Sequence, residues 1–188
     1  MSRIIAGVDE AGRGALAGPV IAAAVVLELG KASIHGLDDS KRLSRVRREQ
    51  LALEIQRTAV AWSIARAEAS EVDALNVLQA SLLAMRRTLT GLAIRPDWIR
   101  VDGNQFPWVD LDGEAVVRGD SRYPEIMAAS ILAKVWRDRE LDVIDRLYPG
   151  YCFRLHKGYP TGAHRDLLLR QGACPAHRLT FGPVSRVC

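Results

Sequence analysis

Cysteine is scarce in this chain, and its spacing suggests no pairing. The 188 residues include Cys152, Cys174 and Cys188, which are far apart and form no Cys-x-x-Cys motif. An odd number of widely spaced cysteines supports neither a disulfide framework nor a zinc site. The sequence therefore favours a reducing, cytoplasmic environment.

Long hydrophobic runs are also missing. The mostly apolar stretch 19–29 has 11 residues, which is too short to span a bilayer. The first residues, Met1-Ser2-Arg3, show no signal-peptide pattern. With 48% hydrophobic residues, the chain is long enough to bury a substantial core. We expect a soluble protein with no membrane contact.

Positive charge is in mild excess and unevenly distributed. The net charge is +4. Lysine and arginine dominate residues 41–57 and again residues 151–188. Basic segments on both sides of an acidic centre suggest that the protein grips a polyanion. A solvated helix face explains the first basic segment as an alternative.

Apolar runs and turn residues predict an alternation of strands and helices. Strands are expected at 4–8, 20–29, 60–65, 98–101 and 114–118. Helices are expected over about 45–58, 70–91, 124–147 and 161–171. In the first helix Ser44 is the expected N-cap, and Val46, Leu51 and Ile55 form the expected buried stripe. Ser70 and Asp73 resemble a capping pair for the second helix.

This order of elements predicts an α/β fold with a mixed five-stranded sheet flanked by helices. The first three strands can pair as antiparallel neighbours, and the last two can run parallel to the first through crossover helices. We expect a catalytic domain over residues 1–148 and a small helical C-terminal segment over 149–188 that contacts the substrate.

Acidic residues follow three of the predicted strands. Asp9 and Glu10 end the first strand, Asp102 ends the fourth, and Asp120 follows the fifth. Any one of them alone fits a turn or a helix cap. Ligands in such sheets bind beyond the carboxyl ends of the strands, where these residues would meet. Carboxylates gathered in one pocket need cations, and their hard oxygens suit Mg²⁺ or Mn²⁺ better than Zn²⁺. The inferred chemistry is two-metal-ion phosphodiester hydrolysis.

A glycine-flanked arginine follows the first acidic pair. Gly12 and Gly14 permit positive φ and a close backbone approach, and Arg13 between them can clamp a phosphate.

Several motifs in order along the chain resemble bacterial ribonuclease HII, over about residues 4–184. They are Asp9-Glu10-Ala11-Gly12-Arg13-Gly14, Asp39-Ser40-Lys41, Val101-Asp102-Gly103-Asn104, Gly119-Asp120-Ser121, Ala128-Ala129-Ser130-Ile131-Leu132-Ala133-Lys134, Arg137-Asp138 and His156-Lys157-Gly158-Tyr159-Pro160-Thr161. The resemblance implies the ribonuclease H fold and cleavage of the RNA strand of RNA–DNA hybrids. It also implies nicking on the 5′ side of single ribonucleotides in duplex DNA, leaving 5′-phosphate and 3′-hydroxyl ends.

The resemblance also implies roles for individual residues. Asp9, Glu10, Asp102 and Asp120 match the catalytic carboxylates that hold Mn²⁺ or Mg²⁺. We expect the enzyme to act as a monomer.

The substrate contacts are implied in the same way. Gly12, Arg13 and Gly14 match the loop that contacts the ribose 2′-hydroxyl and its phosphates. Lys41 matches a lysine at the substrate phosphates, and Tyr159 matches a tyrosine that stacks on the deoxyribose beyond the RNA–DNA junction. Without the motif, Tyr159 would be read as an exposed loop residue.

Ser130, Lys134 and Asp138 recur at helical spacing and form a polar stripe. A structural Lys134–Asp138 pair and a role in steering the metal site are both open. The chain departs from the family pattern at Leu179, where a second arginine is common, and at Ala15, where proline is common. The first change is expected to weaken a contact of the tail and the second to be mild.

Two functions of other classes compete with the nuclease. A binding module of the same fold without catalysis would lack one of the carboxylates, and all are present. A nucleotide-binding protein could use residues 12–18 as a phosphate loop. However, their spacing matches neither common phosphate-loop pattern, and a strand rather than a helix is expected to follow.

Overall fold

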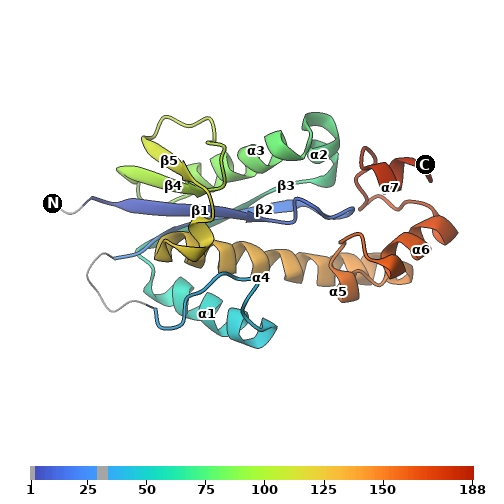
Figure 1. The fold of residues 1–188 in the computed structure, drawn as a ribbon, viewed down its shortest axis with the longest axis horizontal. Helices are drawn as coiled ribbons and strands as arrows, with labels where there is room; N and C mark the ends of the chain where they lie inside the picture. The colour runs from blue at the N-terminus through green and yellow to red at the C-terminus, as the bar shows by residue number, and fades with distance from the viewer. Residues whose placement is uncertain (1–2, 29–33) are drawn as a thin grey trace.

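The computed structural model describes residues 3–28 and 34–188 and shows one mixed sheet between two layers of helices (Figure 1). The sheet order is β3-β2-β1-β4-β5. The strands are β1 (Ile5–Ala11), β2 (Val20–Val26), β3 (Ala61–Ala67), β4 (Trp98–Asp102) and β5 (Gly113–Val116). β1 pairs antiparallel with β2 and parallel with β4, β2 pairs antiparallel with β3, and β4 pairs parallel with β5. The predicted fold class and strand directions are confirmed.

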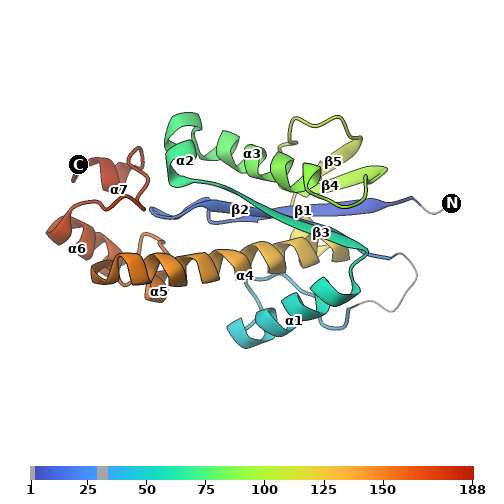
Figure 2. The ribbon, with the colours of Figure 1, turned by 180° about the vertical axis from the view of Figure 1, so that it is seen from behind.

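Helices cover both faces of the sheet. They are α1 (Arg45–Thr58), α2 (Ala69–Leu75), α3 (Val77–Thr90), α4 (Pro124–Leu147), α5 (Phe153–His156), α6 (Gly162–Gln171) and α7 (Gly182–Ser185), with short 3-10 turns η1 (Gly119–Ser121) and η2 (Pro149–Tyr151). α3 lies on one face, and α4 lies on the other with α1 beyond it (Figures 1 and 2). Among the described residues, no helix is long and apolar enough to cross a membrane.

The core consists of two apolar layers divided by the sheet. Every residue of β2 is buried, and its small alanines leave room for helices on both sides. Val8, Ala22 and Val101 pack with the buried side of α3, whereas Ala23 and Val25 pack with α1 and α4. A strand that is buried on both faces reads as a continuous apolar run, which is why β2 was predictable from sequence.

Three helices begin or end where the sequence predicts. The Ser44 hydroxyl caps α1, Gly91 follows the end of α3, and α4 spans the predicted 124–147. The buried stripe of α1 is wrong at one position, because Val46 is exposed. Val46 is five residues before Leu51, so it lies about 140° away around the helix. Ala52 takes its place beside Leu51 and Ile55.

The predicted helix over 70–91 is two helices. Asn76, with φ of 68°, separates them, and its side chain accepts hydrogen bonds from the first turn of α3. The predicted Ser70–Asp73 cap is wrong, because the Glu71 carboxylate accepts from the Glu68 N–H instead. Asp73 accepts from the backbone of Leu179 and Thr180 and so holds the C-terminal tail.

Several predicted strand bounds are also corrected. β1 continues to Ala11 rather than ending at 8, β3 continues to Ala67, and β5 spans 113–116. β2 ends at Val26, and position 29 of its predicted span lies outside the described residues.

The C-terminal segment gathers at the far end of α4, away from the N-terminus (Figures 1 and 2). Tyr151, Phe153 and Cys174 form one apolar cluster with Leu141 of α4 and Ala17 of the loop after β1. The division at 148/149 stays a prediction, although this segment shares a core with the rest.

Gly7 allows the close contact between β1 and α4. A Cβ on Gly7 would lie 2.2 Å from the Glu125 backbone carbon. We predict that Gly7→Ala lowers the free energy of unfolding by about 3 kcal/mol, because the first turn of α4 must move. Gly182→Ala, which has no neighbour within 4 Å, is the matched control. Urea unfolding of both variants measures the difference, and equal stabilities would contradict this packing.

Candidate functional site

Three carboxylates from distant segments meet at the edge of the sheet where the parallel strands β1, β4 and β5 end. Asp9 lies on β1, Asp102 ends the neighbouring parallel strand β4, and Asp120 lies in the η1 turn after β5. One carboxylate oxygen from each lies within 4.8 Å of the others. Asp9 and Asp120 are buried. The predicted convergence of these three residues is therefore present in the fold.

The η1 turn is tied to Asp102. Oδ1 of Asp102 accepts the Gly119 N–H at 2.7 Å and the Asp120 N–H at 3.2 Å. Arg118, just before the turn, has φ of 57°, a left-handed conformation that reverses the chain after β5. The carboxylate of one cluster member thus positions the backbone of another.

Burial, and next the like charges of neighbouring carboxylates, raise the pKa values in this cluster. Burial, together with the charges of Glu10 and Asp102, raises the pKa of Asp9 well above its usual value, although hydrogen bonds from the Glu10 N–H and Ser130 oppose the rise. Burial and the Asp120 charge raise the pKa of Asp102. A cation bound between these groups relieves the repulsion. Clustered oxygen donors of this kind fit a hard divalent ion such as Mg²⁺ or Mn²⁺.

Glu10 is placed differently from the other three predicted carboxylates. Because β1 continues to Ala11, Asp9 and Glu10 point to opposite faces of the strand. Glu10 lies outside the three-carboxylate group and accepts from the Arg13 guanidinium at 3.3 Å. Burial raises the pKa of Glu10, although Arg13 opposes the rise. Glu10 nevertheless lines the same cavity as Asp9.

That cavity, of about 580 Å³, collects nearly all the predicted site residues. Asp120 is absent from its lining but is paired with a residue of it, since Lys41 Nζ is 3.3 Å from Asp120 Oδ2. The lining residues are Asp9, Glu10, Ala11, Gly12, Arg13, Gly14, Ser40, Lys41, Arg48, Asp102, Ser130, Lys134 and Tyr159. The cavity therefore joins the acidic cluster to the glycine turn and to Tyr159.

Two buried arginines hold the loop after β1. Arg178 donates to the carbonyls of Arg13, Ala15 and Gly18 at 2.8–3.0 Å. Burial, and next the charge of Arg137, lower the pKa of Arg178 to about 9, so it remains protonated at neutral pH.

Arg137 joins this loop to the segment that carries Tyr159. It donates to the Ala17 carbonyl at 3.0 Å and to the Lys157 carbonyl at 2.8 Å. Gly12, with φ of 99°, leaves the space that Arg137 fills, since a Cβ there would lie 2.0 Å from Arg137 Nε. Sequence reasoning missed this role of both arginines. For Arg137 the available signal was an arginine within the apolar repeat of the long helix α4, and Arg178 offered no such signal.

The polar stripe on α4, formed by Ser130, Lys134 and Asp138, makes its ion pairs and hydrogen bonds mostly with other groups of the protein. Lys134 Nζ is 2.7 Å from Asp138 Oδ1, and Arg48 is 3.7 Å from Asp138 Oδ2. The predicted Lys134–Asp138 pair is thus present. Ser130 links this stripe to the acidic cavity, because its hydroxyl bonds to the Ser40 hydroxyl at 2.8 Å and its interaction with Asp9 opposes the rise in the pKa of that carboxyl.

Leu179, one of the two positions that depart from the expected motif, lies in the C-terminal tail where the tail contacts Asp73. The Leu179 backbone, not its side chain, makes the contact with Asp73, and the side chain is exposed. The change at this position therefore leaves that contact in place.

Three histidines are buried behind Tyr159. They are His156, His164 and His177, and Nδ1 of His164 lies 2.9 Å from the Tyr159 carbonyl oxygen. Burial lowers the pKa of all three, and for His177 burial and the neighbouring His164 lower the pKa to about 4. The three rings are therefore neutral at pH 7. Sequence reasoning assigned them no role beyond the basic character of this segment.

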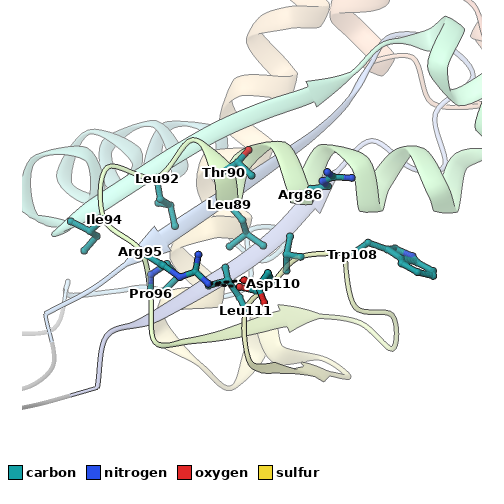
Figure 3. A pocket seen from close by; sticks show the side chains of 11 residues that line it. Arg86, Leu89, Thr90, Leu92, Ile94, Arg95, Pro96, Trp108, Asp110 and Leu111 are labelled. Atoms are coloured by element: carbon teal, nitrogen blue, oxygen red, sulfur yellow. Dashed lines mark hydrogen bonds and ion pairs between the residues drawn. The ribbon is translucent and has the colours of Figure 1, made fainter.

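A second cavity, of about 390 Å³, lies on the α3 side near the start of β4 (Figure 3). Leu89, Leu92 and Leu111 line it, Arg95 pairs with Asp110 at 3.3 Å, and Trp108 stands exposed at its edge. No predicted site residue lines it, so it is separate from the acidic cavity.

Comparisons with known proteins agree with the motifs. The family model described as Ribonuclease HII matches residues 6–184. A Ribonuclease HII from Methylococcus capsulatus is 54% identical over 187 residues, covering 100% of this chain and 96% of that protein. The crystal structure of ribonuclease H2 from Pyrococcus horikoshii OT3 is similar, with a TM-score of 0.83, 26% identity, and coverage of 98% of this chain and 96% of that one. The structure of Bst-RNase HIII in complex with Mn²⁺ has a TM-score of 0.81 at 18% identity, covering 99% of this chain and 69% of that one, and supports the fold.

Divalent metal should stabilise the protein through the acidic cluster. At a concentration about 100-fold above Kd, Mn²⁺ is predicted to raise the Tm by about 5–10 °C. Asp9→Asn keeps an oxygen to accept the Glu10 N–H but removes a repelling charge. This variant should therefore have a higher Tm than wild type in EDTA and gain little from Mn²⁺.

Thermal unfolding with Mn²⁺ and with EDTA measures both effects. Asp110→Asn, at a fully exposed position, is the control and should behave like wild type. A full Mn²⁺-dependent gain in Asp9→Asn would contradict the role of this cluster.

The buried histidines predict a loss of stability in acid. In the unfolded chain His177 takes up a proton near pH 6.5, whereas in the folded chain it does so only near pH 4. The contribution of His177 to the free energy of unfolding is therefore complete above pH 6.5 and falls by about 3 kcal/mol as the pH drops to 4.

Comparison of wild type with His177→Phe isolates this contribution from that of the acidic cluster, where the raised pKa values of Asp9 and Asp102 act in the opposite direction. The stability difference between the two proteins should shrink between pH 7 and pH 4.5 in urea unfolding. A difference that is constant across this range would show that His177 is not held neutral.

Proposed function

The chain belongs to the ribonuclease HII family and so is an endoribonuclease that acts on the RNA strand of RNA–DNA hybrids, and we propose that it also nicks duplex DNA on the 5′ side of a single embedded ribonucleotide. The products would carry 5′-phosphate and 3′-hydroxyl ends. The observation that carries this proposal is one cavity that joins an acidic cluster to a glycine turn with an accessible backbone.

Asp9, Asp102 and Asp120 are proposed to hold divalent metal, with Glu10 completing the set for two ions from the edge of the cavity. When bound, two Mn²⁺ or Mg²⁺ ions activate water and neutralise the leaving oxygen at a phosphodiester. The protein keeps the donor oxygens close through the β1–β4 pairing and through the hydrogen bonds from η1 to Asp102. Because this geometry is fixed by backbone contacts, little reorganisation is needed at the moment of reaction.

The glycine turn is proposed to recognise the ribose. The 2′-hydroxyl is the group that distinguishes RNA from DNA at a given position, so its reader must approach closely. A Cβ on Gly14 would meet nothing within 4 Å, so the backbone at this position faces open space. Arg13, with half of its side chain exposed, can clamp a neighbouring phosphate while Glu10 orients it. Arg178, which binds the Arg13 carbonyl, holds the turn in place.

Lys41 is proposed to contact the substrate phosphates, and Tyr159 the deoxyribose beyond the RNA–DNA junction. Lys41 is largely exposed and reaches Asp120, so its ammonium group can meet a phosphate next to the acidic cluster. The centroid of the Tyr159 ring lies 5.3 Å from Arg137 Cζ and 5.6 Å from Lys134 Nζ, so two cations stabilise the ring. Such a ring can pack on a deoxyribose, because that sugar lacks the 2′-oxygen.

The two competing functions are less well supported. A binding module without catalysis does not account for three carboxylates held within 4.8 Å of one another and a fourth, Glu10, lining the same cavity. A phosphate loop over residues 12–18 requires a helix N-terminus next to the phosphates, but β2 begins at Val20, directly after this loop.

Cleavage of a DNA duplex with one ribonucleotide, mapped at nucleotide resolution, tests the proposal. We expect a single cut 5′ of the ribonucleotide with Mn²⁺ or Mg²⁺, no cut with EDTA, and no cut of the all-DNA duplex. Cleavage of long hybrids without any cut of this substrate would refute the proposed nicking activity.

Tyr159→Ala is predicted to lower kcat/KM on the single-ribonucleotide duplex about tenfold more than on a uniform hybrid, because only the first substrate always presents a deoxyribose at the junction. Trp108→Ala, an exposed aromatic away from the cavity, is the matched control. Equal losses on both substrates would argue against a junction role for Tyr159.

A further inference from the structure

A chain of buried hydrogen bonds ends on the backbone of Tyr159. The Cys174 N–H lies 3.0 Å from His177 Nδ1, His177 Nε2 lies 3.0 Å from His164 Nε2, and His164 Nδ1 lies 2.9 Å from the Tyr159 carbonyl oxygen. His164 and His177 are almost fully buried. The cleavage chemistry proposed above uses neither residue.

The direction of every bond in this chain follows from its two ends. A carbonyl oxygen only accepts, so Nδ1 of His164 carries the proton and its Nε2 accepts. His177 must then donate from Nε2, and its Nδ1 is free to accept the Cys174 N–H. Both rings are neutral in this arrangement, in agreement with their lowered pKa values. The network is therefore fully satisfied with one tautomer for each ring.

The segment that carries Tyr159 needs such support. Lys157 has φ of 51° and Gly158 has φ of 76°, so two left-handed residues in succession precede Tyr159. A non-glycine residue in this region is strained and persists only where its surroundings hold it. The Gly158 N–H donates to His156 Nδ1 at 3.2 Å, and the His156 ring stacks on the His164 ring with their centroids 4.1 Å apart. The Tyr159 carbonyl also accepts the Thr161 N–H at 2.8 Å.

We infer that His164 and His177 are positioning residues that hold the Tyr159 backbone, and through it the ring, at the place where the substrate changes from RNA to DNA. This inference rests on the proposed function of Tyr159. The two buried imidazoles do not line the substrate cavity themselves, but His164 bonds to Tyr159, which does. They would thereby help to determine the preference for single ribonucleotides over uniform hybrids.

The experiment compares two substitutions at one residue. His164→Phe keeps the ring volume but removes the bond to Tyr159. His164→Asn places an amide nitrogen where Nδ1 stands, so it can restore that bond while losing the link to His177. His35→Phe, at an exposed histidine outside this segment, is the control. For each protein, kcat/KM is measured on a single-ribonucleotide duplex and on a uniform hybrid, and thermal unfolding reports whether the variant is folded.

We expect His164→Phe to lower the ratio of the two kcat/KM values about tenfold, because a small displacement of a substrate contact is costly. His164→Asn should recover only part of the ratio, because it restores the bond to Tyr159 without the link to His177, and His35→Phe should match wild type. In the Tyr159→Ala background, His164→Phe should change the ratio no further. A residue that only stabilises the fold would lower both rates equally and would not show rescue by asparagine.

The outcomes separate this inference from the proposed function. If Tyr159→Ala lowers the ratio and folded His164→Phe does not, the positioning role of the histidines is wrong and the junction role of Tyr159 stands. If Tyr159→Ala leaves the ratio unchanged, both are wrong. Should His164→Phe fail to unfold cooperatively, His177→Phe removes the next bond of the chain and is judged by the same ratio.

Discussion

Repulsion among carboxylates that the fold forces together is the constraint on which the rest of the site depends. Asp9, Asp102 and Asp120 come from three separate segments, and their oxygens are fixed by strand pairing and by backbone N–H groups rather than by partner cations alone. Burial and mutual charge raise the pKa of Asp9 and Asp102, so this cluster is costly without a bound cation. The oxygen donors of this cluster fit a hard divalent ion.

Positive charge is arranged around this cluster in two ways. Lys41 and Arg13 are exposed enough to meet a phosphate and are paired with Asp120 and Glu10 at 3.3 Å. Arg137 and Arg178 are fully buried and donate to backbone carbonyls instead of carboxylates. The exposed pair is thus available to a substrate, whereas the buried pair holds the loops that carry the proposed substrate contacts.

Much of this arrangement was predictable from local patterns, and the rest depends on contacts between distant residues. Apolar runs ending in Asp9 and Asp102 indicated the strands and the acidic edge, and Ser44 indicated the start of α1. The split between α2 and α3 was missed because one residue, Asn76, both interrupts the helix and caps the next. The roles of Arg178 and His177 could not be predicted. Arg178 binds Gly18 across 160 positions, and His177 acts through a partner ring that only the tertiary fold supplies.

The most direct test of the acidic cluster is a crystal structure of the protein grown with Mn²⁺, with anomalous scattering data collected to locate the ion. We expect an anomalous peak bounded by the carboxylates of Asp9, Asp102 and Asp120, and the loss of that peak in crystals of Asp9→Asn. A well-ordered structure with no peak among these carboxylates, or with its peak elsewhere, would show that this cluster is not the metal site.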